Sequence, residues 1–348
     1  MSAGSEVPRV AEEQLAPGED AVLARIVKVI CAKYEHDYAD LRPALRDQHA
    51  KPHACVRAEF AVSPDVPSDL RHGIFAEPRT YTAWVRFSSS SAQPRPDSKR
   101  DAHGMAIKLM GVEGDKVLPS ERQATTQDFI VANNPVFFCR NPSDYVVLAA
   151  RLAEGKLLRF FFPGVNPRRW HLRELVNMLV ATTKQVTDPL QIRYWSQTPF
   201  ALGPHAVKYS AKPHGAPADQ EPVPAGRDQL EDAMVRRLAT GDATFDFMVQ
   251  LQTDPRRMPV EDPTIRWSER RSPFRRVATI RIPSQQFASQ AQRNFAQNLS
   301  FSPSHALPEH RPLGGINRVR QAAYEVISEL RHDKNDSLRR EADGRDGP

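Results

Sequence analysis

The chain has few of the residues that build disulfide frameworks, zinc modules and membrane spans. Its 348 residues include three cysteines, Cys31, Cys55 and Cys139, which lie far apart and form no C-x-x-C pair. This pattern excludes a disulfide scaffold and predicts a reducing, cytoplasmic location. No run approaches the roughly 18 consecutive apolar residues of a membrane span. The polar, acidic N-terminus also lacks the apolar segment of a secretory signal.

Several common catalytic motifs are missing as well. The sequence contains no GxGxxG, Walker A, GxSxG or HExxH pattern, so dinucleotide binding, phosphate cradling, serine hydrolysis and zinc proteolysis lose their usual support. His49 and His53 are four residues apart, but Pro52 between them argues against a regular helix that could present both to one metal.

The composition is that of a folded protein. Hydrophobic residues make up 40% and charged residues 26%, which predicts a core-forming globular chain. The length fits two domains, or one large β-rich domain with helical additions. The net charge is +6, but the arginines are scattered and often lie beside acids. We therefore expect a solvated basic surface and no nucleic-acid partner.

Hydrophobic periodicity divides the chain into a leader, one domain and a tail. We expect a flexible leader over 1–19, a single domain over 20–332 and a charged flexible tail over 333–348. Strands are predicted at 56–62, 80–88, 103–109, 129–138 (broken at 133–135), 205–211, 243–252 and 275–282. Helices are predicted at 20–48 (with a break near Pro43), 143–153, 169–183, 226–240 and 314–331. Because no βαβαβ order appears, an antiparallel barrel with helical insertions is favoured.

One predicted helix carries a distinctive pair. Arg320 and Tyr324 are four residues apart, and Arg331 follows seven residues later, so all three lie on one side of the helix. A guanidinium beside a phenol stabilises the phenolate, and tyrosinate is a ligand of ferric haem. Taken alone, an arginine stacked on a surface tyrosine is the simpler interpretation.

Four further segments change that interpretation when they are taken together. They are Arg46-Asp47-Gln48-His49-Ala50-Lys51, Val85-Arg86-Phe87-Ser88, the stretch from Arg100 to Lys108 around Gly104, and Asn133-Asn134-Pro135-Val136-Phe137-Phe138. With the Arg320/Tyr324/Arg331 set they resemble, in order and spacing, the motifs of the haem catalase superfamily. The resemblance covers roughly residues 40–331. It implies an α+β fold, an antiparallel eight-stranded β-barrel of catalase type with helical insertions and a C-terminal helix carrying the haem ligand.

The resemblance also implies a cofactor, haem b (iron protoporphyrin IX), and a role for each matching residue. Tyr324 would be the axial ligand of the haem iron, held as tyrosinate by Arg320. His49 would be the distal acid–base group, oriented by Ser88, and Asn133 would position the peroxide. Phe138, with Phe137, would wall the distal pocket. Arg46, Arg86 and Arg331 would pair with the haem propionates, whose carboxylates suit guanidinium geometry.

The chain departs from typical catalases in ways that leave its activity open. It is shorter, and Gln48 stands before the distal histidine where catalases have valine and allene oxide synthases have threonine. The segment around Gln197 resembles the small catalase-related branch, which includes catalase-like peroxidases and allene oxide synthases. The primary hypothesis is a haem oxidoreductase acting on hydrogen peroxide or organic hydroperoxides. The alternatives are a fatty-acid hydroperoxide isomerase or lyase, and a non-enzymatic haem-binding protein.

The expected partner is therefore a small-molecule peroxide or hydroperoxide. Family habit suggests a homodimer. An NADPH site cannot be assigned from these residues.

Overall fold

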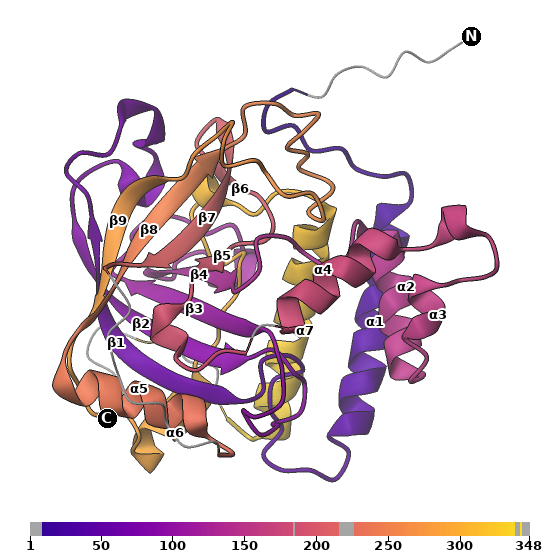
Figure 1. Cartoon of the computed structure of the whole chain (residues 1–348), viewed down its shortest axis with the longest axis horizontal. Helices are drawn as coiled ribbons and strands as arrows, with labels where there is room; N and C mark the ends of the chain where they lie inside the picture. Colours follow the sequence, from indigo (N-terminus) through magenta and orange to yellow (C-terminus); the bar gives the residue numbers. More distant parts are fainter. Residues whose placement is uncertain (1–8, 184, 216–225, 338–341, 343–348) are drawn as a thin grey trace.

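A closed β-barrel flanked by helices forms the body of the molecule (Figure 1). The computed structural model describes residues 9–183, 185–215, 226–337 and 342. Residues 1–8 of the expected leader, and most of the expected tail after 337, lie outside the described residues. Among the described residues, no helix combines the length and the hydropathy needed to cross a membrane.

The described helices are α1 (Glu19–Asp37), α2 (Pro142–Ala153), α3 (Leu158–Phe161), α4 (Leu172–Thr183), α5 (Gln229–Thr240), α6 (Gln290–Asn298) and α7 (Gly315–Lys334). The strands are β1 (Pro52–Val62), β2 (Thr80–Ser89), β3 (His103–Met110), β4 (Thr126–Ala132), β5 (Tyr194–Trp195), β6 (Phe200–Leu202), β7 (His205–Pro213), β8 (Ala243–Leu251) and β9 (Arg275–Ile282).

All strand pairings are antiparallel, and one very short strand closes the ring. The sheet order is β5-β4-β3-β2-β1-β9-β8-β7-β6, and β5 also pairs with β7. Trp195 of β5 is the register partner of Ala132 in β4 and of Ser210 in β7. Eight strands therefore form the closed barrel, and β6 pairs with β7 beside it. This confirms the predicted fold class.

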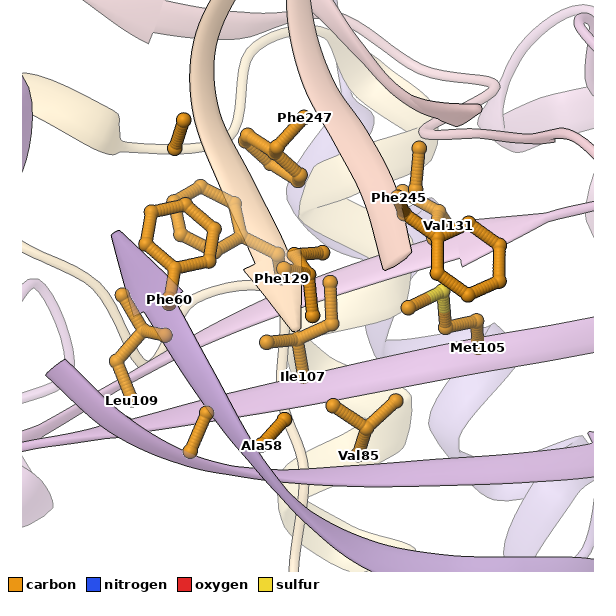
Figure 2. Close-up of a cluster of buried hydrophobic side chains, with 14 of the residues drawn as sticks. Ala58, Phe60, Val85, Met105, Ile107, Leu109, Phe129, Val131, Phe245 and Phe247 are labelled. Atoms are coloured by element: carbon orange, nitrogen blue, oxygen red, sulfur yellow. The ribbon is translucent and has the colours of Figure 1, made fainter. Parts of the chain in front are cut away.

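Aromatic side chains fill the barrel interior. Phe60, Phe129 and Phe247 come from three different strands, and their ring centroids lie 4.9–6.1 Å apart (Figure 2). Along β2 the side chains alternate, so that Val85 and Phe87 point into this core. The residues between them face outward. The filled interior leaves the outer face of the barrel, under the helices, as the place for a site.

Two predicted elements are shorter than expected. The helix predicted to reach residue 48 ends at Asp37, ahead of Pro43, which lacks a backbone N–H and disfavours helix in the residue before it. The strand predicted over 129–138 ends at Ala132. There Asn134 donates a side-chain hydrogen bond to the Val136 carbonyl (2.7 Å) and holds the following residues in a turn.

An arginine on α7 ties three segments together. Arg318 forms ion pairs with Glu13, with Glu19 at the start of α1 and with Glu261. Because Arg318 is largely buried, these contacts are less screened than surface ion pairs. They anchor residues near the N-terminus against the last helix.

The two most deeply buried thiols belong to Cys55 and Cys139. Burial raises the pKa of Cys55 to about 12 and also raises the pKa of Cys139. Neither thiol is ionised near neutral pH.

Candidate active site

His49 is fixed at the entrance to β1 by contacts on three sides. Its backbone lies in the left-handed region, with φ of 59°, and its N–H donates to the Ser90 carbonyl (3.1 Å). The ring Nδ1 lies 3.0 Å from the Ser88 hydroxyl. The ring also covers Gly104 so closely that a Cβ there would lie 2.6 Å from His49 Cε1. The predicted His49–Ser88 pair is present, and Gly104 gives it room.

The imidazole of His49 is neutral. Desolvation by the surrounding protein, followed by the positive charge of Arg86, lowers the pKa of His49 to about 3. A neutral ring that engages Ser88 through Nδ1 can leave Nε2 free as a proton acceptor.

Arg86 connects the histidine to a cluster of cations. It projects from the outer face of β2, is 3% exposed and donates from Nη2 to the His49 carbonyl (2.8 Å). Its buried Nε has no hydrogen-bond partner in the described structure. Burial lowers the pKa of Arg86 to about 10. A buried donor without a partner is costly, so this nitrogen indicates a missing acceptor.

Arg46 and Arg331 meet at the carboxyl end of α6. Arg46 donates to the Ala296 carbonyl (3.1 Å), to the Leu299 carbonyl and to the Gln297 side chain (2.8 Å). Arg331 donates to the Gln297 carbonyl (3.0 Å). The negative end of a helix dipole thus offsets part of their charge.

The three guanidinium groups share one neighbourhood without an acid. Burial, Arg86 and Arg331 together lower the pKa of Arg46. Within the described ranges none of the three forms an ion pair with a carboxylate. Buried cations are normally paired, so this triad of Arg46, Arg86 and Arg331 could hold an anionic group.

On α7, the predicted Arg320–Tyr324 pair is present. The Arg320 guanidinium carbon lies 5.7 Å from the centroid of the Tyr324 ring. Arg320 also donates to Thr198 Oγ1 (2.9 Å) and Asn317 Oδ1 (3.2 Å), which fix its position.

Electrostatic effects place this face of α7 close to the histidine. The charge of Arg320 contributes to lowering the pKa of His49, and a Tyr324 phenolate would raise the pKa of Arg86. The same helix carries Arg331 of the triad, which donates to the Leu299 carbonyl (3.5 Å), as Arg46 does.

Asn133, Phe137 and Phe138, which the resemblance assigns to the distal side, are held by contacts other than those that hold His49. The Asn133 side-chain oxygen accepts from the His103 N–H (3.0 Å), which ties it to β3 beside Gly104. Its amide nitrogen forms no hydrogen bond within the described residues. Phe137 and Phe138 stack with centroids 4.3 Å apart and belong to the cluster under α2 and α3.

Gln48 is exposed and makes no side-chain hydrogen bond in the described part of the chain. It therefore does not restrain His49 from the neighbouring position.

Sequence reasoning gave no role to several residues that support the site. Thr198 and Asn317 hold Arg320, and the Leu299 carbonyl receives Arg46. Their sequence signal is proximity to segments that resemble the family, because Thr198 follows Gln197 and Leu299 lies 21 residues before Arg320. A hydrogen bond to a backbone carbonyl cannot be predicted from the residue type, because every residue has this group.

The residues present fit a haem. Its two propionate carboxylates would supply the acceptors that the arginine triad lacks, including the one missing at Arg86 Nε. Tyr324, with Arg320 over its ring, is a suitable axial ligand.

No protein-family model matches the chain, and no curated protein matches it. Solved structures do. A fungal catalase is 18% identical with a TM-score of 0.64, covering 95% of this chain and 66% of its own. Catalase A from Saccharomyces cerevisiae is 18% identical with a TM-score of 0.64, covering 85% of this chain and 62% of its own. A bacterial catalase is 16% identical with a TM-score of 0.59, covering 95% and 64%.

This chain therefore spans slightly less than two thirds of the length of each of these catalases. TM-scores of 0.59–0.64 over most of the chain, at identities below 20%, show a shared architecture. The chain has the catalase-type fold.

Proposed function

We propose that the chain is a haem-dependent oxidoreductase that reduces or decomposes hydrogen peroxide or organic hydroperoxides. The observation that carries this proposal is the arginine triad without an acid, beside the neutral His49 and the Arg320–Tyr324 pair. The catalase-type fold supports it.

Haem b would be held from two directions. Tyr324 would bind the iron, with the Arg320 guanidinium held over its ring. Arg46, Arg86 and Arg331 would bind the propionates. When bound, the haem iron supplies the redox chemistry that cleaves the peroxide O–O bond.

The chain's own contribution is proton transfer by His49. Nε2 accepts the proton of the hydroperoxide and returns it to the departing oxygen, so that water or an alcohol leaves as a neutral molecule. Ser88 keeps the ring in place through Nδ1. The amide nitrogen of Asn133 can donate to a peroxide oxygen, and Phe138 excludes water. A neutral His49 is ready to accept a proton at every physiological pH.

Two alternatives are less well supported. The isomerase or lyase hypothesis was based on Gln48 and on the segment 193–210. Gln48 is exposed, which removes the first of these two grounds. A purely haem-binding protein would have no need of a desolvated histidine paired with Ser88.

Reconstitution with haemin tests the proposal. We expect a high-spin ferric tyrosinate spectrum in the wild type that Tyr324→Phe abolishes and the control Tyr81→Phe, on β2, retains. Hydrogen peroxide and cumene hydroperoxide should both be offered, with products identified. The proposal would be contradicted if Tyr324→Phe retained the spectrum, or if the haem-loaded wild type consumed neither peroxide. Allene oxide or chain-cleavage products from a fatty-acid hydroperoxide would instead support the isomerase or lyase.

A further inference from the structure

Exposed apolar side chains are concentrated in one part of the molecule. Among the described residues, thirteen large hydrophobic side chains are exposed, and nine of them lie between residues 147 and 180. Of these nine, the most exposed are Val165 (98%) and Leu158 (70%). Scattered exposed hydrophobics are ordinary, but a concentration of this kind marks a binding surface. This region, α2 to α4, projects from the side of the molecule away from the barrel (Figure 1).

The loop that carries Val165 is built to present it. At its base the His171 N–H donates to the Phe161 carbonyl (3.0 Å). Across it, the Trp170 indole donates to the Gly164 carbonyl (2.8 Å) and packs edge-on against Phe162, with centroids 5.2 Å apart. The apolar tip is therefore held out by specific contacts.

Cations surround this tip. Residues 152–173 contain Lys156, Arg159, Arg168, Arg169 and Arg173 but a single acid, Glu154. All five cations are exposed. In the described structure Arg159, Arg168 and Arg169 form no ion pair, while Glu154 is already paired with Arg151 and Lys156.

The positive charge around the apolar tip distinguishes between two possible partners for this surface, a second copy of the chain and a lipid membrane. In a symmetric contact with a second copy of this chain, the same cations would face one another and repel. An anionic lipid surface offers both a hydrocarbon phase for the apolar tip and negative headgroups for the arginines. Tryptophan at the rim of such a patch is typical of the membrane interface.

We propose that residues 156–173, the interfacial segment, dock the protein on anionic membrane surfaces. Leu158, Phe162 and Val165 enter the headgroup–acyl boundary, and Arg159, Arg168 and Arg169 bind lipid phosphates. The face of α4 that bears Leu172 extends the apolar surface. This inference needs no haem and is independent of the proposed enzymatic function.

Vesicle co-sedimentation of the full chain tests the inference. We expect binding to vesicles of phosphatidylcholine with phosphatidylglycerol, weaker binding to pure phosphatidylcholine, and weakening as salt is raised. The variant Leu158→Ser/Val165→Ser should lower the affinity at least about tenfold. Arg168→Gln/Arg169→Gln should lower it about tenfold on anionic vesicles only. Leu41→Ser, which changes an exposed leucine elsewhere, is the matched control and should bind as the wild type does.

Other outcomes would overturn the proposal. They are absence of vesicle binding by the folded wild type, or binding that both interfacial variants retain. Sedimentation equilibrium distinguishes the other occupant, because a dimer abolished by Leu158→Ser/Val165→Ser, without vesicle binding, would show that a second copy covers this surface. Circular dichroism checks that each variant is folded.

Discussion

The left-handed backbone of His49 shows how individual residues set the candidate site. Outside glycine, such a φ is uncommon, and here Arg86 holds the carbonyl while Ser88 and Gly104 hold the ring. Since Arg86 belongs to the arginine triad, a bound anion would stabilise the same arginine that orients the histidine. Anion binding and histidine orientation are thus connected through one side chain.

Gly104→Ala tests how closely the ring is held. The new Cβ would lie 2.6 Å from His49 Cε1, so the ring must move. We expect peroxide turnover by the haem-loaded protein to fall about 10- to 100-fold, with the haem spectrum retained. Steady-state kinetics measures the change. Gly241→Ala, where the added Cβ meets nothing, is the control, and unchanged turnover in Gly104→Ala would show that the contact is unimportant.

Lys208 offers a test of charge burial, with its Nζ 5.2 Å from the centroid of the Trp267 ring. It is 3% exposed, its Nζ has no hydrogen-bond partner in the described structure, and burial lowers its pKa to about 7. We expect Lys208→Met to raise the free energy of unfolding at pH 7 by about 1–3 kcal/mol. Because the folded pKa lies below the unfolded value, wild-type stability rises between pH 7 and about 10.4, and the gain should shrink over that range.

Denaturant unfolding at several pH values measures this gain, with the exposed Lys212→Met on the same strand as control. A loss of stability in Lys208→Met at pH 7 would mean that the ammonium has a stabilising role.

In the candidate site, the sequence predicted two side-chain contacts but not the contacts made to the backbone. His49, Ser88, Arg320 and Tyr324 pair as their motifs implied. By contrast, the partners of Arg46 are mostly backbone carbonyls, whose positions depend on the fold and not on any side-chain pattern.

Among whole elements, the long amphipathic ones were predictable and the short or polar ones were not. β8 and α7 show regular apolar periodicity and lie where it predicts them. β5 has two residues, too few for any alternation. α6 is mostly glutamine, asparagine and arginine. It buries little apolar surface of its own, yet it supplies the carbonyls that hold Arg46 and Arg331.

The attachment of α7 to α1 depends on Arg318. Replacing it by methionine leaves Glu19 and Glu261 without their ion-pair partner in the described structure, and leaves Glu13 with Arg311 alone. We expect Arg318→Met to lower the free energy of unfolding by about 2–3 kcal/mol at pH 7. The hydrogen bond from Arg318 lowers the pKa of Glu19, so the wild type loses this stabilisation as pH falls.

The difference between wild type and Arg318→Met should therefore narrow towards pH 4 and below, as Glu19 becomes protonated. Urea unfolding at pH 7 and pH 4 measures it. A deficit that is constant with pH would point to lost packing and not to charge.

For the molecule as a whole, buried neutral histidines predict sensitivity to mild acid. Burial lowers the pKa of His310 to about 3 and of His103 to about 4, and it also lowers the pKa of His53. His310 accepts the Ile74 N–H at Nε2 (3.0 Å), a bond that a protonated ring would lose. Between the folded pKa values and about 6.5, the unfolded chain binds more protons than the folded chain.

The contribution of these histidines to stability should therefore be constant above about pH 6.5 and fall below it. Each such histidine contributes up to about 1.4 kcal/mol per pH unit. Denaturant unfolding from pH 7.5 to pH 4.5 measures the slope, and His310→Gln should reduce it. A stability that stays constant down to pH 5 would contradict the neutral state of these rings.

The order of the strands and the absence of βαβ units predicted an antiparallel barrel. The strand pairing that closes this barrel was not predicted. Closure depends on Trp195 pairing with both β4 and β7, a long-range match that one sequence does not display. The resemblance to catalases supplied the strand number.

The burial of Cys55 and Cys139 has a consequence for the working life of the proposed catalyst. A protein that consumes an oxidant exposes its own side chains to that oxidant. The thiolate is the form of cysteine that peroxide attacks. With both thiols in the interior and protonated at neutral pH, and with Cys31 the one partly exposed thiol of the described residues, this chain would offer a peroxide few reactive thiols. Burial of these two thiols would let each molecule complete many turnovers before their oxidation.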